Sequence, residues 1–135
     1  MKNILRIIDA NLNRAKEGLR VVEDFARFVL EEARLSSDIK KLRHQIDKIA
    51  RKIYPQLVLS RNSESDIFRE KKESGKKDKF AVVVSNIKRA EESLRVLEEF
   101  SKTISANAGA KFKKIRFKIY GIEKEIVTTA ELTRN

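Results

Sequence analysis

The chain has 135 residues, enough for one domain with a substantial core, and it contains no cysteine, which excludes disulfides, thiolate metal sites and a cysteine nucleophile. Lysine and arginine number 31 against 20 aspartate and glutamate residues, and the resulting charge of +11 favours anionic partners such as phosphorylated metabolites or nucleic acid. No apolar run near the start is long enough for a signal peptide or a spanning helix, so we expect a cytoplasmic protein without a membrane partner.

The first predicted helix covers residues 4–32, where apolar residues recur every three or four positions. Its expected core positions are Ile8, Leu12, Ala15, Leu19, Val22, Ala26 and Val29. Ser36 and Ser37 are N-cap candidates for a second helix. Because Pro55 cannot continue that helix, we predict that it ends near Tyr54.

Two further helices are predicted in the second half of the chain. Asp78 can cap a helix over residues 79–104, and a turn at residues 105–109 leads into the last helix. The connector before them begins with an apolar part that we expect to pack, and it ends with a charged part, residues 69–79, that we expect to be mobile. These elements predict an all-α fold, a four-helix bundle.

An internal repeat relates the two halves of the chain. A shift of 75 residues aligns residues 11–25 with residues 86–100 at nine identical positions. We therefore predict a single domain, residues 1–135, made of two hairpins related by a pseudo-twofold axis. Its parts are the hairpin repeat 4–53, the connector 54–78 and the hairpin repeat 79–132. The simplest arrangement is an up-down-up-down bundle whose first and third helices run parallel, with the connector over one end.

Two polar residues fall on the apolar face of the first helix, Asn11 and Arg14, and the repeat returns them as Asn86 and Arg89. Burying an asparagine or an arginine is costly unless the side chain finds a partner. The four residues therefore indicate either an internal polar network or a cleft that binds anions. Gly18 lies on the same face, where the lack of a side chain lets another helix or a flat ligand approach.

Further repeated charges lie around this face. Glu17 and Glu92 stand one turn from the two arginines, where each can pair with its arginine or face the cleft and bind a metal. The other repeated charges have i, i+3 spacing and are interpreted as surface pairs: Arg20 with Glu23, and Arg95 with Glu98.

The sequence contains no standard nucleotide-binding motif, neither a GxxxxGK[ST] loop nor a GxGxxG turn. Phosphoryl transfer needs positioning, cationic groups and usually Mg²⁺ held by carboxylates, and a basic bundle can supply these without a glycine loop. The absence of these motifs therefore does not exclude a kinase.

Five segments, in order, carry a resemblance to a known family: RIIDANLNRAKEGLRVVEDFARF, LRHQI, SRNSESDI, SNIKRAEESLRVLEEFSK and IRFKIYGIEKEI. Through them nearly the whole chain resembles the stand-alone form of a domain that is often fused ahead of thiamine phosphate synthase. The resemblance implies a hydroxymethylpyrimidine phosphate kinase, which transfers the terminal phosphate of ATP to make the pyrophosphate used in thiamine biosynthesis. It implies ATP and Mg²⁺ as cofactors and a phosphorylated pyrimidine as substrate.

The same resemblance implies site residues. The implied catalytic residues are Arg14, Arg89, Glu17 and Glu92. The implied substrate- and phosphate-binding residues are Asn11, Asn86, Arg43, Arg61 and Arg116. In the connector, Arg61, Ser63 and Asp66 match the family pattern, whereas Asn62 and Phe68 depart from it. Asp66 and Asp9 are the candidate metal ligands.

Two other classes of protein stay open. A non-catalytic helical partner of thiamine phosphate synthase would need no inward-facing arginine. A basic RNA-binding helical module is suggested by the cluster Lys111, Lys113, Lys114, Arg116 and Lys118. Few aromatic residues are available to stack on bases, so nucleic acid is the less favoured partner. The sequence leaves a homo-oligomer open.

Overall fold

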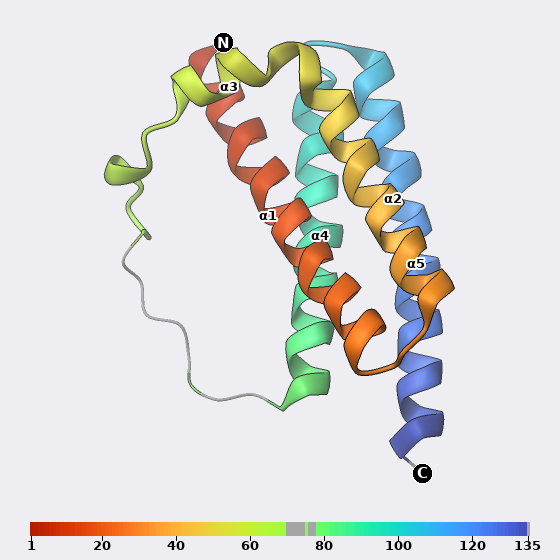
Figure 1. The fold of residues 1–135 in the computed structure, drawn as a ribbon. Coiled ribbons are helices and arrows are strands. Elements are labelled where there is room, and N and C mark those ends of the chain that lie inside the picture. The colour runs from red at the N-terminus through yellow and green to blue at the C-terminus, as the bar shows by residue number, and fades with distance from the viewer. Residues whose placement is uncertain (70–74, 76–77, 135) are drawn as a thin grey trace.

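A computed structural model describes residues 1–69, 75 and 78–134, and the regular elements in these residues are all helices (Figure 1). The helices are α1 (Lys2–Phe28), α2 (Ala33–Ala50), α3 (Tyr54–Ser60), α4 (Lys79–Ser101) and α5 (Ala106–Arg134). Short 3-10 turns cover Arg51–Ile53 and Ser63–Ser65. The four long helices confirm the predicted all-α four-helix bundle. Among the described helices, none has a stretch apolar and long enough to cross a membrane.

The predicted direction of the third long helix is wrong. α1 and α4 lie side by side and run antiparallel, whereas α2 and α4, which are consecutive long helices, run in the same direction (Figure 1). The connector therefore joins opposite ends of the bundle. The 18 residues from Arg61 to Asp78 are long enough for this, since an extended chain covers roughly 3.3 Å per residue and α4 is about 35 Å long. An antiparallel α1 and α4 is also what a pseudo-twofold axis perpendicular to both helices produces.

The turn between α1 and α2 differs from the prediction. α1 ends at Phe28 rather than at residue 32, because Glu31 adopts a left-handed conformation with φ of 55° that a right-handed helix cannot continue. α2 then begins at Ala33, so Ser36 and Ser37 lie inside the helix and do not cap it. The Ser36 hydroxyl instead donates a hydrogen bond across the turn to the Glu23 carbonyl oxygen, at 3.5 Å.

The predicted stop before Pro55 and the predicted cap of α4 are borne out. α2 ends at Ala50, and Pro55 stands in the first turn of the short helix α3, where its missing N–H costs nothing. Of the apolar part of the connector, Leu57 packs in the core as expected, whereas Leu59, Ile67 and Phe68 are exposed. Asp78 accepts a hydrogen bond from the Ala81 backbone N–H at 2.7 Å. The mobility expected of residues 69–79 falls mostly outside the described residues.

The core lies between α1 and α4 and along the inner faces of α2 and α5. The predicted core positions of α1 are buried, except Val29, which is 43% exposed because the helix has already ended there. Small residues let α1 and α4 approach closely: Ala15 and Ala90 are fully buried, and a Cβ added at Gly18 would lie 2.8 Å from the Asn86 carbonyl oxygen. Of the two uses proposed for Gly18, close helix approach is the one observed.

We expect Gly18→Ala to destabilise the protein by about 1 to 3 kcal/mol, because the new methyl group would push against the α4 backbone, which cannot rotate away. The matched control is Gly121→Ala, on α5, where an added Cβ meets nothing within 4 Å. That variant should gain about 0.5 to 1 kcal/mol from helix propensity. Urea unfolding of the two variants measures both effects, and equal stability of the two would contradict the close approach.

Candidate functional site

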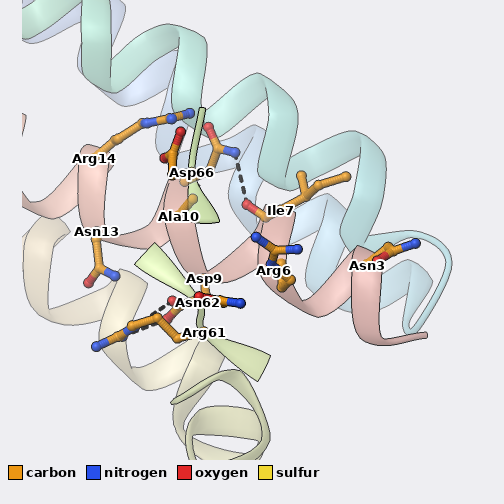
Figure 2. A pocket seen from close by; sticks show the side chains of 11 residues that line it. Asn3, Arg6, Ile7, Asp9, Ala10, Asn13, Arg14, Arg61, Asn62 and Asp66 are labelled. Carbon is orange, nitrogen blue, oxygen red and sulfur yellow. Dashed lines mark hydrogen bonds and ion pairs between the residues drawn. The ribbon is translucent and has the colours of Figure 1, made fainter. Parts of the chain in front are cut away.

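A pocket of about 530 Å³ lies between the first half of α1 and the segment that follows α3. Figure 2 shows the side chains of both segments meeting there. α1 contributes residues spaced as one helical face, namely Asn3, Arg6, Ile7, Asp9, Ala10, Asn11, Asn13 and Arg14. The facing segment contributes Arg61, Asn62 and Asp66. The pocket therefore combines three guanidinium groups with amides and carboxylates.

A two-pronged ion pair fixes the facing segment onto α1. Arg61 donates from Nε to Asp9 Oδ2 and from Nη2 to Asp9 Oδ1, each at 2.8 Å (Figure 2). Asp9 is buried, and its hydrogen bonds and charge raise the pKa of the Arg61 guanidinium. This geometry is the strong form of an arginine–carboxylate interaction, and it holds Asn62 and Asp66 beside α1.

The two repeated asparagines make the same local hydrogen bond. Asn11 donates from Nδ2 to the Ile7 carbonyl at 2.9 Å, and Asn86 donates to the Val82 carbonyl at 2.8 Å. Asn11 is buried as predicted and lines the pocket, whereas Asn86 is only half-buried and lies outside the pocket lining. The structure thus brings one of the two predicted asparagines to the site.

The predicted burial of Arg14 and Arg89 is wrong, since both side chains are exposed. α1 and α4 contact each other through alanine and glycine residues. The arginine next to the alanine on each helix therefore points outward beside this contact rather than into it. Glu17 and Glu92 are exposed as well. Within the described residues, none of these four side chains makes a hydrogen bond or an ion pair. Their charges are free to meet a ligand, and Arg14 lines the pocket.

The prediction of two surface pairs is right only in part: Arg20 does contact Glu23, at 3.7 Å, but Arg95 pairs with Glu99 instead, and the carboxylates of Glu23 and Glu98 are both buried. Each pairs with an arginine of the second helix of its own hairpin. Arg43 Nε lies 3.0 Å from Glu23 Oε1, and Arg116 Nη2 lies 2.9 Å from Glu98 Oε1. Burial alone would lower the pKa of Arg116, and its bonds to Glu98 and Tyr120 outweigh that effect and raise it.

Arg43 and Arg116 therefore hold α2 on α1 and α5 on α4, and neither lines the pocket. Their predicted role in phosphate binding stays a prediction. The repeat in the sequence could have indicated these two ion pairs. Glu23 and Glu98 align at a shift of 75 residues, and Arg43 and Arg116 align at a shift of 73. Sequence reasoning also missed Asn3, Arg6 and Asn13 in the pocket. Asn3 has helical spacing from Arg14, and Asn13 has it from Arg6, which could have indicated these positions.

The two candidate metal ligands, Asp9 and Asp66, differ in how many of their carboxylate oxygens already accept hydrogen bonds. Both oxygens of Asp9 are held by Arg61, whereas among the described residues Asp66 engages Oδ1 alone, which accepts from the Phe68 backbone N–H at 3.0 Å. In the described part of the chain, no group of three or more acidic, histidine or cysteine side chains converges on one point. Mg²⁺ commonly uses one or two protein carboxylates together with substrate phosphates and water, so Asp66 fits such an ion.

A further buried acid, also outside the pocket, lies between α4 and α5. Glu91 is 5% exposed, and its Oε2 atom has no hydrogen-bond partner among the described residues. Burial, together with a hydrogen bond shared with Glu123, raises the pKa of its carboxyl to about 7, although the charge of Lys88 opposes the rise. Lys88 Nζ lies 3.6 Å from Glu91 and 3.0 Å from Glu123.

This raised pKa predicts that stability falls with rising pH. Protonated Glu91 is the form that the fold favours, so its contribution is complete below the ordinary pKa of 4.5 and is lost as pH rises through about 7. We expect Glu91→Gln to flatten this dependence and to add about 1 to 2 kcal/mol at pH 8. The control is Glu92→Gln at the neighbouring exposed position. Urea unfolding from pH 4 to pH 8 measures both, and parallel curves for Glu91→Gln and the parent would contradict the assignment.

Fold and site together define a class: small four-helix bundles of two repeated hairpins, with an arginine-rich polar pocket on the first helix. The family is then shown by comparison. The chain matches the model of the ThiD2 family over residues 6–125, and it belongs to that family. No solved structure shows a significant match.

The chain is also similar to part of several curated proteins. It is 38% identical over 130 residues to the thiamine-phosphate synthase of Synechocystis sp. (strain PCC 6803), a match that covers 92% of this chain and 36% of that protein. It is 34% identical over 129 residues to the thiamine-phosphate synthase of Rhodopirellula baltica, with coverage of 93% and 34%. The chain thus spans about a third of the length of these relatives.

Proposed function

We propose that this chain acts in thiamine biosynthesis, in association with thiamine phosphate synthase, and that its own reaction is the ATP-dependent phosphorylation of hydroxymethylpyrimidine phosphate. Family membership and the name shared by the similar proteins support the pathway and the association. The sequence resemblance supports the kinase reaction. The arginine-rich pocket on α1 is the observation that carries the assignment to this chain's own residues.

The pocket suits a phosphate-to-phosphate transfer on electrostatic grounds. A nucleoside triphosphate and a monophosphate repel each other, so cationic groups must neutralise their charge before they meet. Arg6 and Arg14 line the pocket without an ion pair among the described residues, and Arg61 lines it while bound to Asp9. Planar guanidinium groups bind phosphate oxygens in pairs, which fixes orientation as well as charge.

The amides beside these arginines suit the rest of a pyrimidine substrate. Asn3, Asn13 and Asn62 line the pocket and carry both donors and acceptors, as the ring nitrogens and amino group of a pyrimidine require. Asp66 would hold Mg²⁺ together with the phosphates, and the ion would supply charge neutralisation between them. Asp9 serves to position Arg61.

A second candidate function is a non-catalytic one. The similar proteins are named for the synthase reaction, and this chain matches about a third of each, so a domain that supports the synthase without chemistry of its own fits those names directly. In that case the pocket would bind the pyrimidine phosphate and no phosphate would be transferred.

One assay separates the two candidates. The purified chain is incubated with hydroxymethylpyrimidine phosphate, ATP and Mg²⁺, and the pyrophosphate product is measured by ion-exchange chromatography, with free hydroxymethylpyrimidine as the control substrate. Product formation from the monophosphate supports the kinase. No product, together with faster synthase turnover when the chain is added to a thiamine phosphate synthase, supports the non-catalytic partner. If neither occurs, both proposals fail.

A further inference from the structure

The contact between α2 and α5 is the most open contact between neighbouring long helices of the bundle (Figure 1). A groove of about 320 Å³ and a cavity of about 350 Å³ lie there, near the end of α2 and the first half of α5. They share Lys48, Ile49 and Lys111, and together they form one surface, the α2–α5 seam. The seam shares no lining residue with the pocket on α1, and the described ion pair between the two helices, Arg34 with Glu125, lies outside it.

The floor of the seam is apolar. Ile49 and Ile115 line the groove, and Ile53 and Ile104 line the cavity. Ile104 is 39% exposed, so part of this apolar surface is open to water. Phe112, the aromatic residue in the two linings, is buried and offers no open ring face on which a nucleic-acid base could stack. The floor therefore favours aliphatic side chains over bases.

Both rims of the seam are basic. Lys48 comes from α2, whereas Lys111, Lys114 and Lys118 come from α5, where their i, i+3, i+7 spacing puts them in one row. All four side chains are exposed. Among the described residues, none of the four makes an ion pair or a hydrogen bond. An apolar groove with charged rims is typical of a surface that binds another protein.

Elsewhere in the bundle, lysines at helix contacts are neutralised by carboxylates. Lys16 pairs with Asp47 between α1 and α2, at 2.7 Å, and Lys88 pairs with Glu123 between α4 and α5, at 3.0 Å. No acidic residue lines the seam in the described part of the chain. α5 has none from residue 106 to residue 122, and Asp47, on the adjoining part of α2, is held by Lys16. The lysines of the two helices therefore repel one another across the seam, and an acidic occupant relieves that repulsion.

We propose that the α2–α5 seam is a docking surface for an acidic amphipathic helix of a partner protein. The apolar side chains of that helix pack on the isoleucines of the floor, and its carboxylates pair with the lysines of both rims, as amphipathic helices bind grooves in other proteins. The row from Lys111 to Lys118 is about 10 Å long, which corresponds to about two turns of the partner helix.

Two other kinds of anionic partner fit the seam less well. An RNA backbone would meet the lysines but would leave the apolar floor unused, and a membrane surface is too flat to enter a groove between two helices. The docking surface goes beyond the proposed function, and it requires neither the kinase reaction nor any residue of the pocket on α1.

Binding of a synthetic helical peptide to the full chain tests the surface. The probe carries leucine on one face and glutamate on the other, and fluorescence anisotropy of the labelled peptide measures its affinity. We expect Lys48→Gln/Lys111→Gln to weaken binding at least about tenfold, because one cation is lost from each rim. The matched control is Lys40→Gln/Lys113→Gln, which removes one exposed lysine from each of the same helices outside both linings. It should leave the affinity within about twofold of the parent's.

Two further probes separate the apolar floor from the charge. A peptide with serine in place of every leucine should bind at least about tenfold more weakly, because it buries no apolar side chain in the seam. A peptide with lysine in place of every glutamate should not bind, because its charges have the same sign as those of the rims.

The proposal is overturned if the leucine–glutamate peptide does not bind the parent chain. An equal loss in the seam variant and the control variant would also overturn it, because net charge rather than the seam would then determine binding. The same holds if the serine peptide binds as tightly as the leucine peptide. Tighter binding of single-stranded RNA or of phosphatidylglycerol vesicles, with the same dependence on Lys48 and Lys111, would assign these lysines to another class of partner.

Discussion

Arg14→Lys is expected to fold normally and to lose turnover of hydroxymethylpyrimidine phosphate by at least about tenfold. The substitution keeps the positive charge but removes the planar pair of donors that binds two phosphate oxygens at once. Arg14 lines the pocket and has no partner among the described residues, so no internal contact is lost with the guanidinium. The rate constant and the melting temperature of the purified variant measure the two parts of this prediction.

Arg27→Lys is the control for this experiment. Arg27 also lies on α1 and is exposed, but its guanidinium stacks over the Phe28 ring at 4.8 Å, away from the pocket lining. It should retain the parent's activity. Full activity in Arg14→Lys combined with a loss in Arg27→Lys would show that the wrong face of α1 has been assigned to the substrate.

Arg89→Lys tests whether the second repeat shares the function of the first. Arg89 is the repeat equivalent of Arg14 but does not line the pocket, so its loss of turnover should be smaller. The family resemblance implied a catalytic role for both arginines. Equal effects of the two substitutions in the same assay would extend the site across to α4.

Arg116→Ala is expected to give the largest loss of stability, about 3 kcal/mol or more. The change leaves the buried Glu98 carboxylate without its guanidinium partner, and the nearest remaining cation is the ammonium of Lys102 at 3.9 Å. Urea unfolding measures the loss. Arg95→Ala, which removes an exposed arginine 3.3 Å from Glu99, is the matched control and should have little effect.

A double variant separates pairing from packing at this site. Glu98→Leu with Arg116→Met removes both charges and keeps similar volume, so it should be far more stable than Arg116→Ala. If both variants unfold equally easily, the loss comes from packing of the arginine stem rather than from an orphaned carboxylate.

The helical periodicity and the repeat were enough to predict the four long helices and the cap at Asp78, and they left helix approach and ligand approach as alternatives at Gly18. They were not enough to predict the direction of α4. A repeat defines two similar hairpins, but the long connector permits either end of the bundle as the starting point of the second. The direction of α4 depends on how the matching faces of α1 and α4 fit together.

The candidate site, too, could be predicted from the sequence only in part. A helical wheel places Asn11 and Arg14 on one face, and it cannot tell how wide the contact with the next helix will be. The contact is narrow because small residues form it, so Asn11 is buried while Arg14 is exposed. The wheel also placed Glu23 on the polar face, because it contains no information about Arg43 on the neighbouring helix.

The antiparallel contact of α1 and α4 has a consequence for the history of the chain. A hairpin whose face fits a twofold copy of itself has the surface of an isologous homodimer, in which both subunits must carry the same residue at each position. Joining two copies in one chain removes that constraint. Position 16 has become a lysine that pairs with Asp47, while its counterpart, position 91, is a buried glutamate beside Glu123. Covalent fusion thus lets corresponding positions of the two halves take different residues.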